Sequence, residues 1–186
     1  PYASLATGAN ELSPMDMASG AQTLANTGVH RDPYMIERIE DARGTVLYQY
    51  QSASIEQTLP AEVAINAADV MRGVIERGTA RRTPLEDDRP AAGKTDTQDN
   101  NTNAWFVGFR EGDRKDHGFQ NVVVGVWTGN DNNAPMSKKS VGGRLPAQVA
   151  AEFLKGPMND LNKKSQNLKK TDSPHHHEKD RPLENV

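Results

Sequence analysis

The sequence contains no cysteine, few aromatic residues and no long apolar run. The lack of cysteine excludes disulfide bonds and thiol catalysis, and it fits either an intracellular or an extracytoplasmic setting. No stretch approaches the roughly 18 consecutive apolar residues of a membrane-spanning helix. No signal peptide opens the sequence either. We therefore expect no membrane contact by this segment.

The charge is nearly balanced, with 22 basic and 25 acidic residues and a net charge of −3. Because no basic face dominates, we expect no nucleic acid as a partner. The 186 residues suffice for one domain with a core. Polar residues concentrate near the C-terminus, a composition typical of disordered segments. We predict a domain over residues 1–157 and a disordered polar tail over 158–186. The opening residues read as the middle of a longer polypeptide, and we expect a fragment.

Local patterns predict an α+β fold, in which helices flank an antiparallel sheet. Over residues 12–28 a helix is indicated by Ser13 as N-cap, Pro14 at the first position and Asp16 completing a capping box. Apolar periodicity and turn residues predict the remaining elements. These are a hairpin over 34–50, a helix over 59–78, strands over 90–97, 103–110 and 121–129, and a closing helix over 145–156.

Three possible ligand motifs fail on inspection. Lys94 and Thr95 follow a glycine as in a phosphate-binding loop, but Asp88 stands where that loop needs its first glycine. The stretch 99–110 begins like a calcium loop, yet Ala104 replaces its required glycine, and its final glutamate is missing as well. The three adjacent histidines at 175–177 could bind a stray metal ion, but adjacent side chains diverge in a segment of disordered composition, so we expect no functional metal site there. We expect no metal and no cofactor.

The strongest signal is a series of stretches in a fixed order. They are "RGTARR" (77–82), "AAGKTDTQDNNTNAWFVGF" (91–109), "VVVGVWTGND" (122–131) and "GGRLPAQVAAEF" (142–153). The series resembles the C-terminal part of the transpeptidase domain of penicillin-binding proteins, most closely the bifunctional class. The resemblance extends over residues 1 to about 157 and implies a part of the serine β-lactamase/penicillin-binding transpeptidase fold.

The resemblance implies acyl transfer on peptidoglycan stem peptides, with β-lactams as substrate mimics and an active-site serine as nucleophile. It places Lys94 in the family's Lys-Thr-Gly motif, where the ammonium group attracts a carboxylate. Thr95 and Thr97 are two apart on a strand, so both hydroxyl groups can face the ligand. The N–H of Thr97 matches an oxyanion-hole donor. The implied location is the extracytoplasmic face of a bacterial membrane, with the parent protein anchored there.

The sequence departs from the family pattern in two ways. No Ser-x-x-Lys motif occurs, and the single Ser-x-Asn, at 165–167, falls in the polar tail. Without the nucleophile we predict that this chain is inactive alone. Asp96 stands where the family has glycine, on the same strand face as Lys94 and roughly 6–7 Å along the strand. It can pair with the lysine and occupy space that glycine leaves open. We predict that Asp96 impairs ligand binding.

Two other interpretations remain open, a non-catalytic peptide- or partner-binding module of the same fold and an unrelated α+β binding domain. Trp105, Phe106, Phe109 and Trp127 are interpreted as core or sheet-face aromatics, and the Gly142–Gly143 pair as a turn. If the sheet continues into an absent N-terminal part, an exposed edge would favour association. We therefore expect the isolated chain to dimerise, aggregate or need the rest of its domain as a partner.

Overall fold

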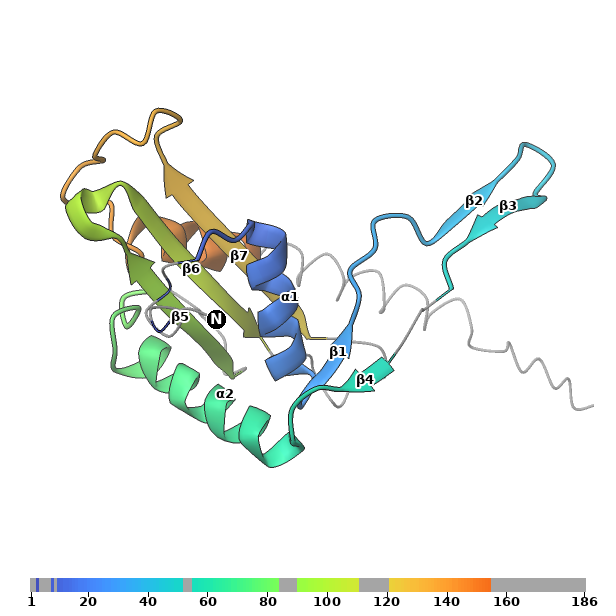
Figure 1. Ribbon diagram of the computed structural model, residues 1–186, viewed down its shortest axis with the longest axis horizontal. Coiled ribbons are helices and arrows are strands. Elements are labelled where there is room, and N and C mark those ends of the chain that lie inside the picture. The colour runs from blue at the N-terminus through green and yellow to red at the C-terminus, as the bar shows by residue number, and fades with distance from the viewer. Residues whose placement is uncertain are drawn as a thin grey trace, which may run out of the picture.

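The computed structural model describes residues 10–51, 55–83, 90–110 and 121–154, together with Ala3 and Gly8. In this part of the chain a three-stranded antiparallel sheet is covered by helices on both faces (Figure 1), which confirms the α+β prediction. The tail predicted over 158–186 lies outside the described residues, so the domain boundary stays a prediction.

The first helix, α1 (Pro14–Ala25), begins at the predicted capping box. The Asp16 N–H donates to Ser13 Oγ at 3.2 Å, and the Ser13 N–H donates to the Asp16 carboxylate at 2.9 Å. Hydrogen bonds from the side chain and backbone of Ser13 hold the pKa of Asp16 below its ordinary value. The helix ends where Gly28, with φ +87°, donates its N–H to the Thr23 carbonyl.

Ser13→Ala in the complete domain is expected to lower the free energy of unfolding by about 1 kcal/mol at pH 7, because α1 loses its cap. Folding lowers the pKa of Asp16 from its ordinary value of 3.8. The stability that its carboxylate contributes is therefore fully present above pH 3.8 and is lost as the pH falls through the lowered pKa. Denaturant titration at several pH values measures both effects. Ser19→Ala inside α1 is the matched control, and an equal loss there would exclude the cap as the cause.

The main sheet has the order β5 (Ala91–Thr97), β6 (Asn103–Arg110) and β7 (Val122–Gly129). Val107 and Phe109 meet α1 on one face, whereas Phe106 and Val124 meet the helix over 145–154 on the other. Figure 1 shows α1 in front of the sheet and this last helix behind it. The helix α2 (Ala61–Glu76) packs beside β5 and contributes side chains to both apolar clusters. The sheet is therefore fixed from three sides.

Two short ribbons connect α1 to α2. In the first, β1 (Val29–Arg31) pairs with β4 (Ile55–Gln57). In the second, β2 (Arg38–Glu40) pairs with β3 (Val46–Gln49), which confirms the predicted hairpin. Its turn forms because Asp41 accepts two backbone N–H groups, from Thr45 and Arg43, which also lower its pKa. The hairpin extends away from the body of the molecule (Figure 1).

Candidate functional site

The candidate site residues lie on β5, the strand at one edge of the main sheet. Strand alternation puts Lys94 and Asp96 on the face that carries Val107, and Thr95 and Thr97 on the opposite face. In the described part of the chain, β5 pairs with β6 alone. The site is thus built on a strand whose other side bears no further strand.

The backbone N–H of Thr97 points to that unpaired side. Gln98, the next residue, donates its N–H to the carbonyl of Asn103 on β6 at 3.0 Å. Backbone N–H groups along an antiparallel strand alternate between its two sides, so the Thr97 N–H points away from β6. This orientation is the one that a donor to a bound oxyanion requires.

The two threonine hydroxyl groups share a face, as predicted, and each has a partner within the chain. Thr95 is 8% exposed, and its Oγ1 lies 2.6 Å from Oγ1 of Thr79, just beyond α2. Thr97 Oγ1 accepts the backbone N–H of Gly142 at 3.0 Å. The sequence interpretation gave no role to Thr79 and saw only a turn at Gly142. The one available signal was that both belong to the ordered stretches of the family pattern.

Lys94 and Asp96 both have exposed side chains on one face. The structure places no ion pair between these two described side chains, and the predicted effect of Asp96 on ligand binding stays a prediction. Lys94 Nζ instead donates to the carbonyl of Thr95, its neighbour in sequence. The flexible lysine reaches a nearby backbone acceptor, which leaves the Asp96 carboxylate turned to solvent. Asp96 still places a negative charge beside Lys94 on the same strand face.

Aromatic side chains lie on both faces of the sheet near this strand. Phe106 and Phe109 are buried, which confirms their assignment to the core. Trp105 on β6 is the cross-strand partner of Asp96 on β5 and of Trp127 on β7. Trp127 is 40% exposed, and its Nε1–H donates to Asn103 at 2.7 Å. The cross-strand row from Asp96 to Trp127 is therefore partly open to solvent.

The loop between β5 and β6 has no metal-binding character. Asn100 and Asn101 adopt φ values of +60° and +55°, in the left-handed region that asparagine tolerates well. These two residues form the turn that joins the strands. Across the described residues, no group of three or more His, Asp or Glu side chains is placed to hold a metal ion. The histidines at 175–177 lie outside that part.

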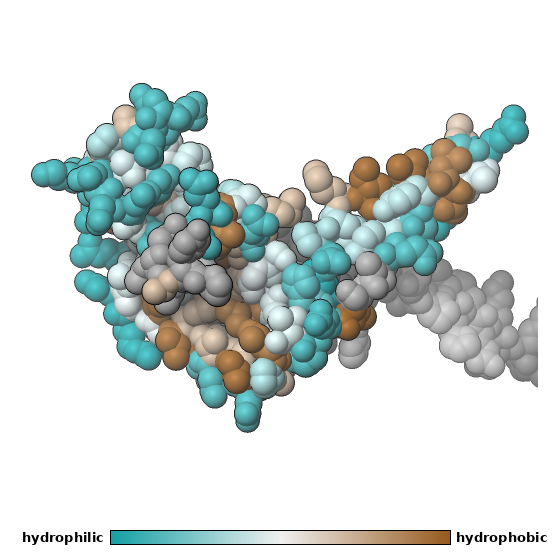
Figure 2. Space-filling view, in the orientation of Figure 1, coloured by the Kyte–Doolittle hydropathy of each residue, from teal (hydrophilic) through white to brown (hydrophobic). Residues whose placement is uncertain are grey.

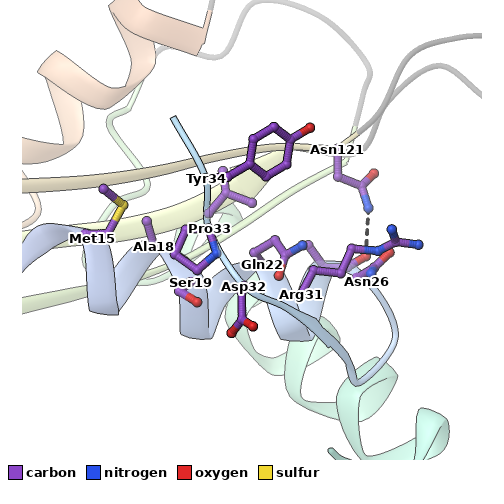
Figure 3. A pocket seen from close by; sticks show the side chains of 12 residues that line it. Met15, Ala18, Ser19, Gln22, Asn26, Arg31, Asp32, Pro33, Tyr34 and Asn121 are labelled. Atoms are coloured by element: carbon purple, nitrogen blue, oxygen red, sulfur yellow. Dashed lines mark hydrogen bonds between the residues drawn. The ribbon is translucent and has the colours of Figure 1, made fainter. Parts of the chain in front are cut away.

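A separate hollow of about 670 Å³ lies between α1 and the chain that follows β1 (Figure 3). Met15, Ser19 and Gln22 of α1 line it, facing Arg31 and Tyr34. None of its lining residues belongs to β5. The hollow is therefore separate from the candidate site residues on β5.

The chain belongs to the penicillin-binding protein transpeptidase domain family, whose pattern it matches over residues 1–153. It is 35% identical over 155 residues to penicillin-binding protein 1A of Aquifex aeolicus, a match that covers 83% of this chain and 20% of that protein. It is 32% identical over 148 residues to penicillin-binding protein 1B of Haemophilus influenzae, covering 79% and 17%. The chain thus spans about a fifth of the length of these relatives.

The fold matches solved penicillin-binding proteins as well. The structure of the PonA1 protein from Mycobacterium tuberculosis in complex with penicillin V superposes with a TM-score of 0.71 and 25% identity. That match covers 85% of this chain and 41% of the PonA1 chain. Among the helices of the described residues, none is both long and apolar enough to cross a membrane.

Proposed function

We propose that this chain forms one wall of the acyl-transfer cleft of a peptidoglycan D,D-transpeptidase and binds the stem peptide or a β-lactam along β5. The observation that carries the proposal is the end of β5, a strand that pairs with β6 alone in the described part of the chain: there the Thr97 N–H points away from β6, and the side chain of Lys94 on the same strand is exposed. An edge strand of this kind can receive an extended peptide through backbone hydrogen bonds.

Each residue has a distinct part in the proposed site. Lys94 supplies positive potential that holds the substrate carboxylate. Thr97 offers its N–H to the carbonyl oxygen that becomes negative during acylation. The hydroxyl group of Thr95 bonds to Thr79, and that of Thr97 bonds to Gly142. Because a hydroxyl group can form several hydrogen bonds, both can still bond to a ligand.

The attacking serine is supplied by polypeptide beyond this chain, because the sequence contains no Ser-x-x-Lys motif. The chain alone then forms no acyl-enzyme. In this proposal the complete protein acts at the extracytoplasmic face of a bacterial membrane, where peptidoglycan stem peptides are found. Relatives named penicillin-binding proteins 1A and 1B support the assignment.

The second candidate function is a non-catalytic module of the same fold that binds a peptide or a protein partner. Asp96 is the observation that favours it, because a carboxylate beside Lys94 lowers the positive potential of the strand face. The two functions differ in one measurable property, covalent acylation of the complete domain by a penicillin.

Asp96→Gly in the complete domain is expected to speed acylation by a fluorescent penicillin about fivefold to tenfold. A unit charge roughly 6–7 Å from the lysine, at a dielectric constant between those of protein surface and water, changes the interaction by about 1 kcal/mol. The measurement is the second-order acylation rate constant, followed on denaturing gels.

Two further variants separate charge from shape in this experiment. Asp96→Asn removes the charge and is expected to give most of the increase, whereas Glu37→Gln at the base of the hairpin, away from β5, should give none. Equal rates for Asp96 and its variants would show that Asp96 does not impair binding. A complete domain that is never acylated, with or without Asp96, would select the non-catalytic module.

A further inference from the structure

The hairpin of β2 and β3 and the residues that flank it carry a cluster of apolar and aromatic side chains, most of them exposed. We call Tyr34, Met35, Ile36, Ile39, Tyr48 and Tyr50 the hairpin patch; together they line a shallow hollow of about 360 Å³. Figure 2 shows these apolar side chains gathered along the arm that projects from the body. Met35 is 90% exposed. Soluble monomers seldom leave such a contiguous patch uncovered, and it marks an interaction surface.

Charged and polar side chains lie on the hairpin outside the patch. Ile39 and Tyr48 are cross-strand partners within the patch, whereas the neighbouring pair Arg38 and Gln49 projects to the other side. Arg38 forms an ion pair with Glu40 on that side. At these two residue pairs the apolar side chains face one side and the polar side chains the other, an arrangement that suits contact with protein on the patch.

The hairpin also needs support that its own contacts do not supply. A two-stranded ribbon is marginally stable in water unless a third strand or another layer packs on it. Tyr34 stacks on Tyr50 at the base of the hairpin, with ring centroids 3.9 Å apart. This stack fixes the base, while Ile39 and Tyr48 farther out remain exposed. A partner on the patch would complete the missing layer.

The size of the patch indicates what kind of partner covers it. Five of the six patch side chains, all but Tyr50, are exposed. At about 200 Å² each and roughly half exposed, they present on the order of 500 Å² of surface. A stable complex of separate chains buries about 800 Å² per partner, which is more than the patch offers. Contacts between parts of one chain can be smaller, because the linkage supplies an effective concentration of about millimolar.

We propose that the hairpin patch packs against polypeptide of the same protein that lies outside residues 1–186. The matched relatives are long enough to contain such polypeptide, because the match to this chain covers only 20% of the Aquifex aeolicus protein. In Figure 1 the hairpin and β5 lie on opposite sides of the molecule. The contact on the patch is therefore away from the proposed cleft, and it does not depend on the proposed acyl transfer.

Photo-cross-linking in the product of the complete gene tests this contact. Tyr48 is replaced by p-benzoylphenylalanine, an aromatic side chain of similar shape, and the protein is irradiated and digested for mass spectrometry. The matched control carries the same group at Gln49, the next residue, which projects to the polar face. We expect cross-links from position 48 to peptides of the same chain outside this segment, several times more abundant than those from position 49.

Every outcome bears on the proposal. Cross-links that double the mass on a denaturing gel would identify a second copy as the occupant and overturn it. Equal, low yields at positions 48 and 49 would show a free patch and also overturn it. If the Tyr48 variant does not fold, the same group at Met35 gives the answer, because that side chain is almost fully exposed. Acylation by penicillin in the same samples reports separately on the cleft.

Discussion

Gly142→Ala is expected to lower the free energy of unfolding of the complete domain by about 2–4 kcal/mol. A Cβ atom at this position would lie 2.3 Å from the carbonyl oxygen of Trp105 and 2.4 Å from that of Asp96. Both atoms belong to the backbone of paired strands, so neither can move aside as a flexible side chain would. The segment around Gly142 must therefore lift away from β5 and β6.

The displacement would also reach the candidate site, because the Gly142 N–H donates to Thr97 Oγ1. Penicillin acylation should then fall even at temperatures where the variant is folded. Gly20→Ala in α1 is the matched control: nothing lies within 4 Å of a Cβ atom there, and alanine favours a helix by up to about 1 kcal/mol. Denaturant titration compares the two variants. Equal stability changes would contradict the close packing of Gly142 against the strands.

Local sequence signals were sufficient to predict the elements of this fold. The capping box at Ser13 placed the start of α1 correctly, and the strand over 103–110 has the predicted bounds. Both depend on residues close in sequence. The hairpin was predicted for the same reason, from the turn at Asp41. That its apolar side chains would be uncovered was not predicted, because exposure depends on which other parts of the protein surround it.

The site was predicted in part. Strand alternation correctly placed Thr95 and Thr97 on one face. Their hydroxyl partners were missed because Thr79 and Gly142 lie 16 and 45 residues away in sequence and are brought near only by tertiary packing. The side-chain partner of Lys94 was not predicted for another reason. Sequence spacing sets the distance between the Cβ atoms of Lys94 and Asp96, but the long lysine side chain can reach several acceptors. In the structure its Nζ donates to a backbone carbonyl.

Lys94→Ala in the complete domain is expected to reduce the penicillin acylation rate about a hundredfold. A hydrogen bond between charged groups contributes about 1.5–3 kcal/mol, and each 1.36 kcal/mol changes a rate tenfold. Because the Lys94 side chain is exposed, its loss should change the free energy of unfolding by less than about 0.5 kcal/mol. A large effect on acylation with little effect on stability separates a ligand contact from a structural role. Stopped-flow acylation and thermal unfolding of the same samples measure the two quantities.

Lys138→Ala is the control for charge alone, since this lysine lies on the loop that leads to Gly142 and has no place on β5. It should leave acylation within about twofold of the parent rate, because an exposed charge at a distance is screened by salt. Lys94→Arg tests geometry: it keeps the charge, but the planar guanidinium group does not replace a compact ammonium group at a close contact. An arginine variant as slow as the alanine variant would show that β5 needs the shape of lysine. Acylation unchanged in Lys94→Ala would remove Lys94 from the site and leave the Thr97 N–H as the main contribution of this strand.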